Sequence, residues 1–245
     1  MRRRSICLIL IAALFCLTAC REQKLPQTSQ PAVTAPVQTE PAAVPTTEQP
    51  TEAPTEPPTQ PLPEPADEDF VKVTDYIPTI RQELFYATEN NFTGQRIYEF
   101  TDAYLRYGTV KKLAKVSEDL AELGLYLKIW DGFRPVSAQF RLWEICPDPT
   151  YVANPTTGYS SHSRGNTVDL TLVDESGMEL EMPTGFDDFS AKADRNYADC
   201  SEAAANNAQI LEILMEKHGF TGYFGEWWHF SDTDSYPVEE VFEPA

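Results

Sequence analysis

Three stretches of the chain carry patterns that predict helices. Apolar residues recur at helical spacing over residues 110–123, and Gly124 fits the position just after the end of that helix. A shorter helix is expected over residues 137–145, which two prolines follow. The third helix runs from Ser201, a good N-cap residue, to about His218.

Other stretches have the composition of strands. Residues 125–130 predict a strand, residues 167–173 are rich in β-branched and aliphatic side chains, and residues 223–230 predict an aromatic strand. Residues 97–107 mix aromatic and aliphatic side chains and fit either a strand or a helix. Because helices and strands are interspersed without strict alternation, we expect an α+β fold.

The N-terminus predicts an export signal over residues 1–19. Residues 2–4 are arginines, and residues 6–17 form an apolar run that is too short to span a membrane. The run closes on Leu-Thr-Ala-Cys, which resembles the bacterial lipobox and implies cleavage before Cys20 and lipidation of that residue. The alternative is a soluble secreted protein in which Cys20 is incidental.

A proline-rich segment follows, and we expect residues 20–69 to be a lipidated cysteine and a disordered tether. Residues 26–66 hold twelve of the twenty prolines, and residues 21–69 lack glycine and aromatic side chains. Such a segment buries too little apolar surface to offset its ordering entropy, and its prolines favour an extended chain. The rest, residues 70–245, has the length of one domain.

The chain is strongly acidic, with a formal net charge of −19 at pH 7. Apart from residues 2–4 it has no basic cluster that could contact phosphates, so we expect no nucleic-acid partner. The same charge disfavours direct docking onto anionic lipid, which leaves the lipid anchor as the expected contact with the membrane. Cys146 and Cys200 remain after export, either as a disulfide or as two buried thiols.

Two of the three histidines belong to a pattern typical of a catalytic zinc site. His162 stands seven residues before Asp169, with a glycine between them that can bend the chain, and His229 lies near the C-terminus. Two imidazoles and one carboxylate leave the fourth position of Zn²⁺ open for water, whereas a structural site fills it with protein atoms, usually cysteines. The sequence therefore favours one zinc ion and metal-assisted hydrolysis.

Glu226 and Arg134 are candidates for the remaining chemistry. Glu226 precedes His229 by three residues, a natural place for a general base. On a regular strand these two would face opposite sides, so the chain must bend there or Glu226 must lie just before the strand. Arg134, held extended by Pro135, could stabilise an oxyanion, although alone it is more typical of a surface arginine on a loop.

Together these motifs resemble a known family. The pattern Ser160-x-His162-x-x-Gly165-x-x-x-Asp169, joined to Glu226-x-Trp228-His229, resembles the D-alanyl-D-alanine metallopeptidases. Three further collinear segments resemble the D-Ala-D-Ala dipeptidase branch, of the VanX type: residues 86–88 with 91–94, residues 130–135, and residues 161–165 with 168–172.

The resemblance implies a single domain like the Hedgehog amino-terminal domain, with a central antiparallel sheet. It also implies a role for each candidate: His162, Asp169 and His229 as zinc ligands, Glu226 as general base and then acid, Arg134 as stabiliser of the tetrahedral intermediate, Ser160 near the substrate carboxylate, and Tyr86 and Asp187 at the free amino group. Pro183 stands where the family commonly has glycine, which bears on the placement of Asp187.

Three functions follow as hypotheses. The first is hydrolysis of D-Ala-D-Ala or a related D-dipeptide at the cell envelope, in peptidoglycan turnover; a lipoprotein on the outer face of the membrane cannot reach precursors inside the cell. The second is a D,D- or L,D-carboxypeptidase that trims stem peptides, which a short segment between Arg134 and His162 would admit. The third is a zinc-bound wall-binding module without catalysis.

Overall fold

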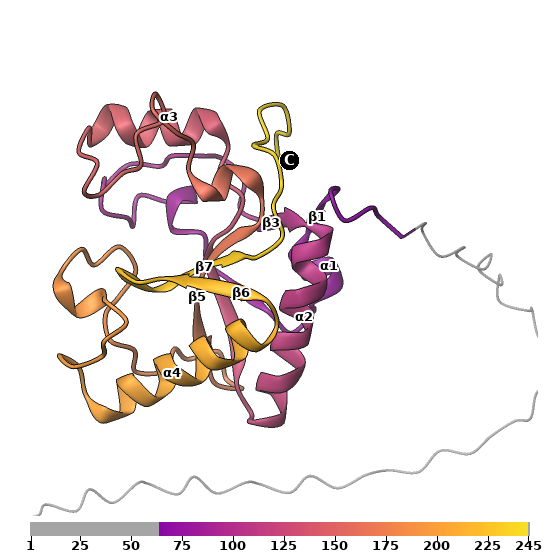
Figure 1. Ribbon diagram of the computed structural model, residues 1–245, viewed down its shortest axis with the longest axis vertical. Coiled ribbons are helices and arrows are strands. Elements are labelled where there is room, and N and C mark those ends of the chain that lie inside the picture. The colour runs from indigo at the N-terminus through magenta and orange to yellow at the C-terminus, as the bar shows by residue number, and fades with distance from the viewer. Residues whose placement is uncertain (1–63, 245) are drawn as a thin grey trace, which may run out of the picture. The chain divides into compact units, whose positions relative to one another are not determined.

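The computed structural model describes residues 64–244, which form an α+β fold (Figure 1). Its helices are α1 (Val73–Tyr76), α2 (Tyr107–Glu122), α3 (Val136–Ile145) and α4 (Glu202–Lys217), with short 3-10 turns η1 (Phe85–Ala87), η2 (Ser161–Arg164) and η3 (Ala191–Ala193). Its strands are β1 (Phe70–Lys72), β2 (Arg81–Gln82), β3 (Tyr104–Arg106), β4 (Tyr126–Asp131), β5 (Thr167–Val173), β6 (Phe220–Tyr223) and β7 (Glu226–Asp232). The interspersed order confirms the predicted fold class.

The main sheet has five strands in the order β2-β4-β5-β7-β6. Every neighbouring pair is antiparallel except β2 with β4, so the expected antiparallel sheet is in fact mixed at one edge. Across its centre, Asp131 pairs with Asp169, and Asp169 pairs with His229. Three chemistry-bearing residues thus form a row across β4, β5 and β7.

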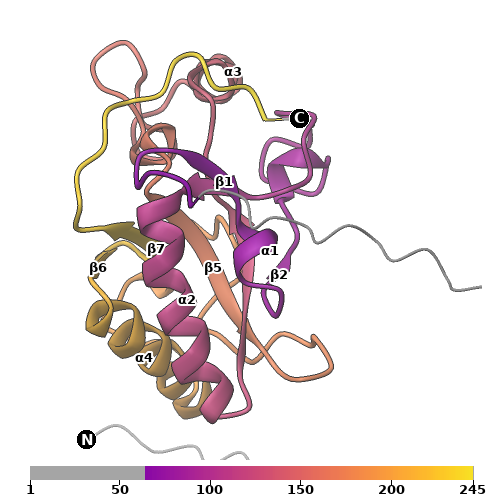
Figure 2. The same cartoon turned by 90° about the vertical axis from the view of Figure 1, so that its right-hand side faces the viewer.

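Helices α2 and α4 lie side by side against this sheet (Figure 2). Leu113 of α2 and Leu211 of α4 are fully buried in one hydrophobic core with Leu170 of β5. Because successive strand residues point to opposite faces, Asp169 points away from that core. The helices therefore support one face of the sheet and leave the other for the site.

The predicted start of α4 and the predicted end of α2 are both confirmed. The Ser201 hydroxyl accepts a hydrogen bond from the Ala204 amide at 3.0 Å, so Ser201 is the N-cap of α4. Gly124 has φ +70 just after α2, a left-handed conformation that favours glycine. Helix α2 begins at Tyr107, three residues before the predicted start.

Two predictions about strands were wrong. Residues 223–230 are not one strand: β6 ends at Tyr223 and β7 begins at Glu226, so the aromatic segment spans a hairpin turn. Residues 97–107 form neither a continuous strand nor a helix, because only the three residues of β3 pair, with β1, before α2 starts. Aromatic composition did not show the turn, since Phe224 occupies it.

Residues 64–69, the first that the structure describes, pack against the rest of the domain. The Tyr107 hydroxyl donates to Glu64 at 3.1 Å, so residues 64–69, which the sequence assigned to the tether, contact α2. The predicted signal, the lipidation site Cys20 and the tether up to residue 63 lie outside the described residues. Cys146 and Cys200 are both free thiols. Within residues 64–244, no helix has both the length and the apolar character needed to cross a membrane.

Candidate metal centre and active-site cleft

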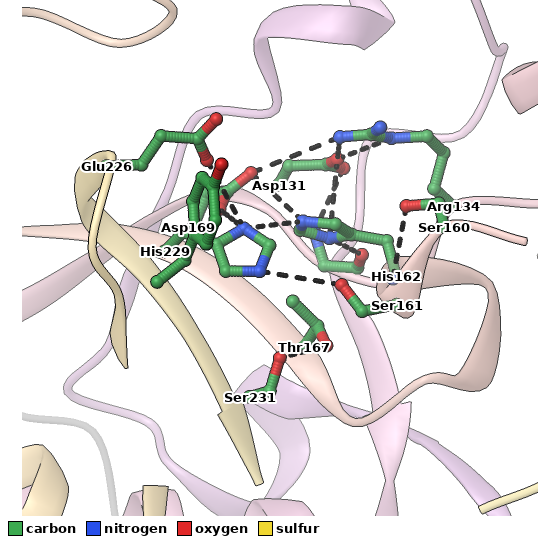
Figure 3. Close-up of polar contacts among 12 residues, drawn as sticks. Asp131, Arg134, Ser160, Ser161, His162, Thr167, Asp169, Glu226, His229 and Ser231 are labelled. Carbon is green, nitrogen blue, oxygen red and sulfur yellow. Dashed lines mark hydrogen bonds and ion pairs between the residues drawn. The ribbon is translucent and has the colours of Figure 1, made fainter. Parts of the chain in front are cut away.

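The predicted ligands converge on one point (Figure 3). His162 comes from η2, Asp169 from β5 and His229 from β7. His162 Nε2 lies 3.2 Å from Asp169 Oδ2 and 3.4 Å from His229 Nδ1, while His229 Nδ1 lies 3.0 Å from Asp169 Oδ1. Two imidazole nitrogens and one carboxylate group, from η2, β5 and β7, thus form a small triangle.

This triangle fits a zinc ion. A tetrahedral Zn²⁺ with bonds of about 2.0–2.1 Å has ligand–ligand edges of about 3.3 Å, close to the distances in the cluster. Asp169 Oδ1 is buried and accepts no hydrogen bond from residues 64–244, so it has a lone pair free for a cation. Although burial alone would raise it, the two imidazoles hold the pKa of Asp169 well below its usual range. The carboxylate is therefore ionised, as a metal ligand must be.

Neighbouring groups orient both imidazoles. His162 Nδ1 donates to the carbonyl oxygen of Gly132 at 2.8 Å, which leaves its Nε2 as the atom that faces the cluster. His229 Nε2 lies 3.4 Å from the Ser161 hydroxyl, so its Nδ1 faces the cluster. Ser160 caps η2 by accepting a hydrogen bond from the His162 amide at 3.3 Å.

Glu226 and His229 face the same side of the chain, which on a regular strand they could not do. It is the first residue of β7, and its Oε2 lies 3.5 Å from His229 Nδ1. The β6–β7 pairing is irregular: Gly222 pairs with Phe230, but the next β6 residue, Tyr223, pairs with Glu226. An advance of one residue on β6, from Gly222 to Tyr223, thus corresponds to four residues on β7, from Phe230 back to Glu226. This bulge brings Glu226 and His229 to the same side of the strand. Burial raises the pKa of Glu226, with Asp169 as a further cause.

Arg134 is not a surface residue, because only 8% of it is exposed. Its Nε and Nη2 donate to Asp131 Oδ2 at 2.9 and 2.6 Å, and its Nη1 donates to Gln139 Oε1 at 3.0 Å. Its Nη2 lies 4.0 Å from Asp169 Oδ2. Despite the cost of burial, Asp131 raises the pKa of Arg134 above its ordinary value, so the group stays charged.

Sequence reasoning missed Asp131, which organises this side of the site. It is fully buried, and its Oδ1 accepts from the Tyr98 hydroxyl at 2.7 Å and from the Gly132 amide at 3.0 Å. Its Oδ2 lies 3.6 Å from His162 Nδ1 as well as binding Arg134. The available signal was its position three residues before Arg134, in the segment that carried the family resemblance.

Tyr86 and Asp187 form a second group in the same cleft. The Tyr86 hydroxyl donates to Asp187 Oδ2 at 2.9 Å, although the two residues are 101 positions apart. The Tyr86 ring also lies 4.9 Å from the Arg134 guanidinium carbon. Asp187 has φ +53, and burial raises its pKa to about 8. Pro183 has therefore not displaced Asp187 from the cleft.

One cleft of about 310 Å³ joins all eight candidate residues. Its lining consists of Tyr86, Arg134, Pro149, Thr150, Tyr151, Ala153, Tyr159, Ser160, Ser161, His162, Asp169, Asp187, Phe189, Tyr223, Glu226 and His229. The sequence did not predict the aromatic rim, whose members Tyr151, Tyr159, Phe189 and Tyr223 are each more than a third exposed. The cleft thus combines a candidate metal centre with an aromatic rim.

Comparisons with known proteins agree with this geometry. Residues 66–243 match the family model described as D-Ala-D-Ala dipeptidase. The chain is 40% identical to the D-alanyl-D-alanine dipeptidase of Escherichia coli over 69% of this chain and 89% of that protein. It is 32% identical to the D-alanyl-D-alanine dipeptidase of Enterococcus faecalis, over 70% of this chain and 95% of that protein.

A solved structure of a vancomycin-resistance D,D-pentapeptidase, VanY, in complex with Zn(II) is a distant likeness. It is 15% identical, covers 54% of this chain and 74% of that chain, and has a TM-score of 0.37. The sequence matches carry the assignment without it. With its family model spanning nearly the whole described domain and close relatives matched over most of their length, the chain belongs to the D-Ala-D-Ala dipeptidase family of metallopeptidases.

Proposed function

We propose that this protein uses one zinc ion to hydrolyse D-alanyl-D-alanine at the cell envelope. The observation that carries the proposal is the triangle of His162, Asp169 and His229, the first two of them buried, with the Glu226 carboxyl beside it in the same cleft. A donor set of two nitrogens and one carboxylate leaves a position for water, which is the arrangement of a catalytic zinc site.

Glu226 is the proposed general base and acid. Bound zinc would lower the pKa of a water molecule to about 7 and polarise the substrate carbonyl. Burial raises the pKa of Glu226, which brings the carboxyl closer to the pH at which it can both take and return a proton. Glu226 takes the proton of the attacking water and delivers it to the leaving amine.

Arg134 is the proposed stabiliser of negative charge on the substrate oxygen. Its guanidinium is fixed on one side by Asp131 and Gln139, and it lines the cleft near Asp169. A donor that is already fixed needs little reorganisation when charge develops, and loss of such a donor costs about 10²–10³ in turnover.

Tyr86, Asp187 and Ser160 are the proposed contacts to the two ends of the dipeptide. An ammonium group at Asp187 would favour the ionised carboxylate, which its buried site disfavours when the cleft is free. Ser160, at the start of η2, lies on the cleft wall that carries His162. A site with a partner for the free amine fits a dipeptidase better than a carboxypeptidase, whose substrate continues beyond that point.

The proposed place of action is the outer face of the bacterial cytoplasmic membrane. The arginines at residues 2–4, the apolar run at residues 6–17 and the lipobox-like Cys20 support export and lipidation. The proline-rich tether would let the enzyme reach into the cell wall. C20A should release soluble enzyme with unchanged turnover in a cell-fractionation experiment; C20A that stays with the membrane would contradict the anchor.

The function is tested by offering D-Ala-D-Ala, L-Ala-L-Ala and a stem pentapeptide to the zinc-loaded protein and following amine release. We expect cleavage of D-Ala-D-Ala alone. Cleavage of the pentapeptide in place of the dipeptide would establish the carboxypeptidase alternative. Absence of cleavage of all three would support the non-catalytic wall-binding alternative.

A further inference from the structure

The β6–β7 hairpin needs support that its own pairing does not provide. Between the Gly222–Phe230 pair and the Tyr223–Glu226 pair, three β7 residues have no partner on β6. A bulge of this kind leaves backbone groups without ladder partners, and buried carbonyls need donors from elsewhere. Since the bulged segment holds both Glu226 and His229, whatever satisfies its carbonyls also sets the position of the chemistry.

A single arginine outside the hairpin supplies those donors. Arg195 Nε donates to the carbonyl of Tyr223 at 2.9 Å, and its Nη2 donates to the carbonyls of Trp227 and His229 at 3.0 and 2.9 Å. Its backbone amide donates to the carbonyl of Phe224 at 3.0 Å. One residue thus bonds four carbonyls that surround Glu226 on both sides along the chain.

The guanidinium is itself held firmly. Its side chain is 5% exposed, and its Nη1 lies 3.3 Å from Glu212 Oε1 of α4. Glu212 Oε2 accepts from the Tyr197 hydroxyl at 2.7 Å, and the Arg195 guanidinium carbon lies 4.3 Å from the Phe230 ring centroid. A Cβ on Gly222 would lie 2.3 Å from that carbon, so β6 has space for the guanidinium only because position 222 is glycine.

We propose that Arg195 is a positioning residue for hydrolysis: it holds the bulged start of β7 so that Glu226 reaches the zinc-bound side of the cleft. This inference rests on the proposed function, because it assigns Glu226 the role of base. Arg195 does not line the cleft and acts through the backbone of the hairpin. The three side-chain bonds leave from two separate nitrogens, Nε and Nη2, whose spacing the planar guanidinium fixes, so lysine should not replace it.

The first test is hydrogen exchange of the zinc-loaded chain, which does not depend on activity. In R195Q we expect faster exchange of the amides in residues 223–230, with β5 unchanged. K192Q, an exposed lysine in the same segment, is the matched control and should leave both regions as in the wild type. Unchanged exchange of residues 223–230 in R195Q would overturn the proposal, whatever the substrate proves to be.

The second test separates positioning from general support of the fold. R195Q should lower kcat for D-Ala-D-Ala by about 10- to 100-fold, the cost of a small misplacement of a catalytic group, with KM and zinc content changed little. In an E226A background the same change should have no further effect on the residual rate, because Arg195 acts through Glu226. An equal loss in both backgrounds would show general destabilisation and contradict the inference.

Two milder variants keep the test decisive if R195Q does not fold. R195K should also lose kcat because a single nitrogen cannot occupy the positions of both Nε and Nη2, whereas E212Q, which keeps those bonds, should lose less. Wild-type kcat in R195K would overturn the proposal. If the wild-type chain did not cleave D-Ala-D-Ala, the proposed function would fail, and the exchange result would still decide whether Arg195 holds the hairpin.

Discussion

The candidate metal centre and the loop-borne wall of the same cleft, which is formed by Tyr86 and Asp187, are built in different ways. Asp169 and His229 belong to neighbouring strands and are paired in register within the sheet. Tyr86 and Asp187 belong to a 3-10 turn and a loop, and one side-chain hydrogen bond of 2.9 Å joins them. In the metal centre a backbone ladder fixes Asp169 and His229, and a hydrogen bond from Nδ1 to the Gly132 carbonyl fixes His162 of η2. The second group is fixed by side chains on loops.

This difference indicates that one part of the cleft serves catalysis and the other selects the substrate. Catalytic groups need close positional control, which strands supply, while loops on a rigid scaffold can vary to select substrates. We therefore expect substitutions at the metal centre and at Glu226 to abolish or strongly slow the reaction. Substitutions at the loop-borne wall should instead alter substrate affinity and leave the metal in place.

The largest expected effect is loss of the metal. H162A should lose both zinc and activity, because a site with two remaining protein ligands binds the ion far more weakly. The measurement is metal content by atomic emission alongside hydrolysis. H218A is the matched control, since His218 lies 2.6 Å from Asp119 outside the cleft and should keep both properties. Full zinc occupancy in H162A would refute the ligand assignment.

The next effect in size concerns the base. E226Q preserves the shape of the side chain but cannot accept the proton, so kcat should fall by about 10²–10⁴-fold with zinc retained. Steady-state kinetics with metal analysis measures this. E216Q, an exposed glutamate on α4, should behave as the wild type. A wild-type rate in E226Q would mean that another group takes the proton.

At the loop-borne wall we expect an effect on affinity. D187N removes a charged partner of the substrate amine, an interaction worth about 1.5–3 kcal/mol, so KM for D-Ala-D-Ala should rise about 10- to 100-fold. Zinc content should not change. D188N alters the neighbouring carboxylate, which does not line the cleft, and should leave KM unaltered. Loss of zinc in D187N would break the division between the two regions.

The last prediction concerns stability rather than activity, and its sign follows from burial of the same carboxyl. Burial raises the pKa of Asp187 from its ordinary 3.8 to about 8, so between these values the folded state keeps a proton that the unfolded state releases. The stabilising contribution is complete below the unfolded pKa and is lost as the pH rises through about 8. Urea unfolding of the metal-free protein should therefore show a steeper fall in the free energy of unfolding from pH 5 to pH 8 in the wild type than in D187N. Equal slopes would show that the carboxyl does not titrate in this range.

The sequence predicted the metal centre because its residues and spacing are local features. His162 and Asp169 stand seven residues apart across a turn, and Glu226 and His229 stand three apart, so one short bend in each segment brings the two members of that pair together. The resemblance to the family implied that the two pairs meet. The long helices were predictable for the same reason. Their caps and apolar spacing are written within single stretches of chain.

What the sequence did not predict depends on contacts between distant segments. Asp131 binds Tyr98 and Arg134 and lies beside His162. The Arg195 side chain bonds carbonyls that lie 28 to 34 positions further along the chain. The parallel pairing of β2 with β4 likewise involves only two residue pairs and depends on how distant segments pack. Neither a buried carboxylate such as Asp131 nor an arginine that bonds backbone carbonyls, such as Arg195, follows a sequence pattern that distinguishes it from a charged residue on the surface.

The most direct test of the whole account is the rate ratio between D-Ala-D-Ala and its N-acetylated form. Acetylation leaves the scissile bond in place but removes the ammonium group that Tyr86 and Asp187 are proposed to receive. We predict that the zinc-loaded enzyme cleaves the free dipeptide and that acetylation abolishes cleavage. Equal rates on the two compounds would contradict the dipeptidase assignment of the wall and favour a carboxypeptidase that uses the same metal centre.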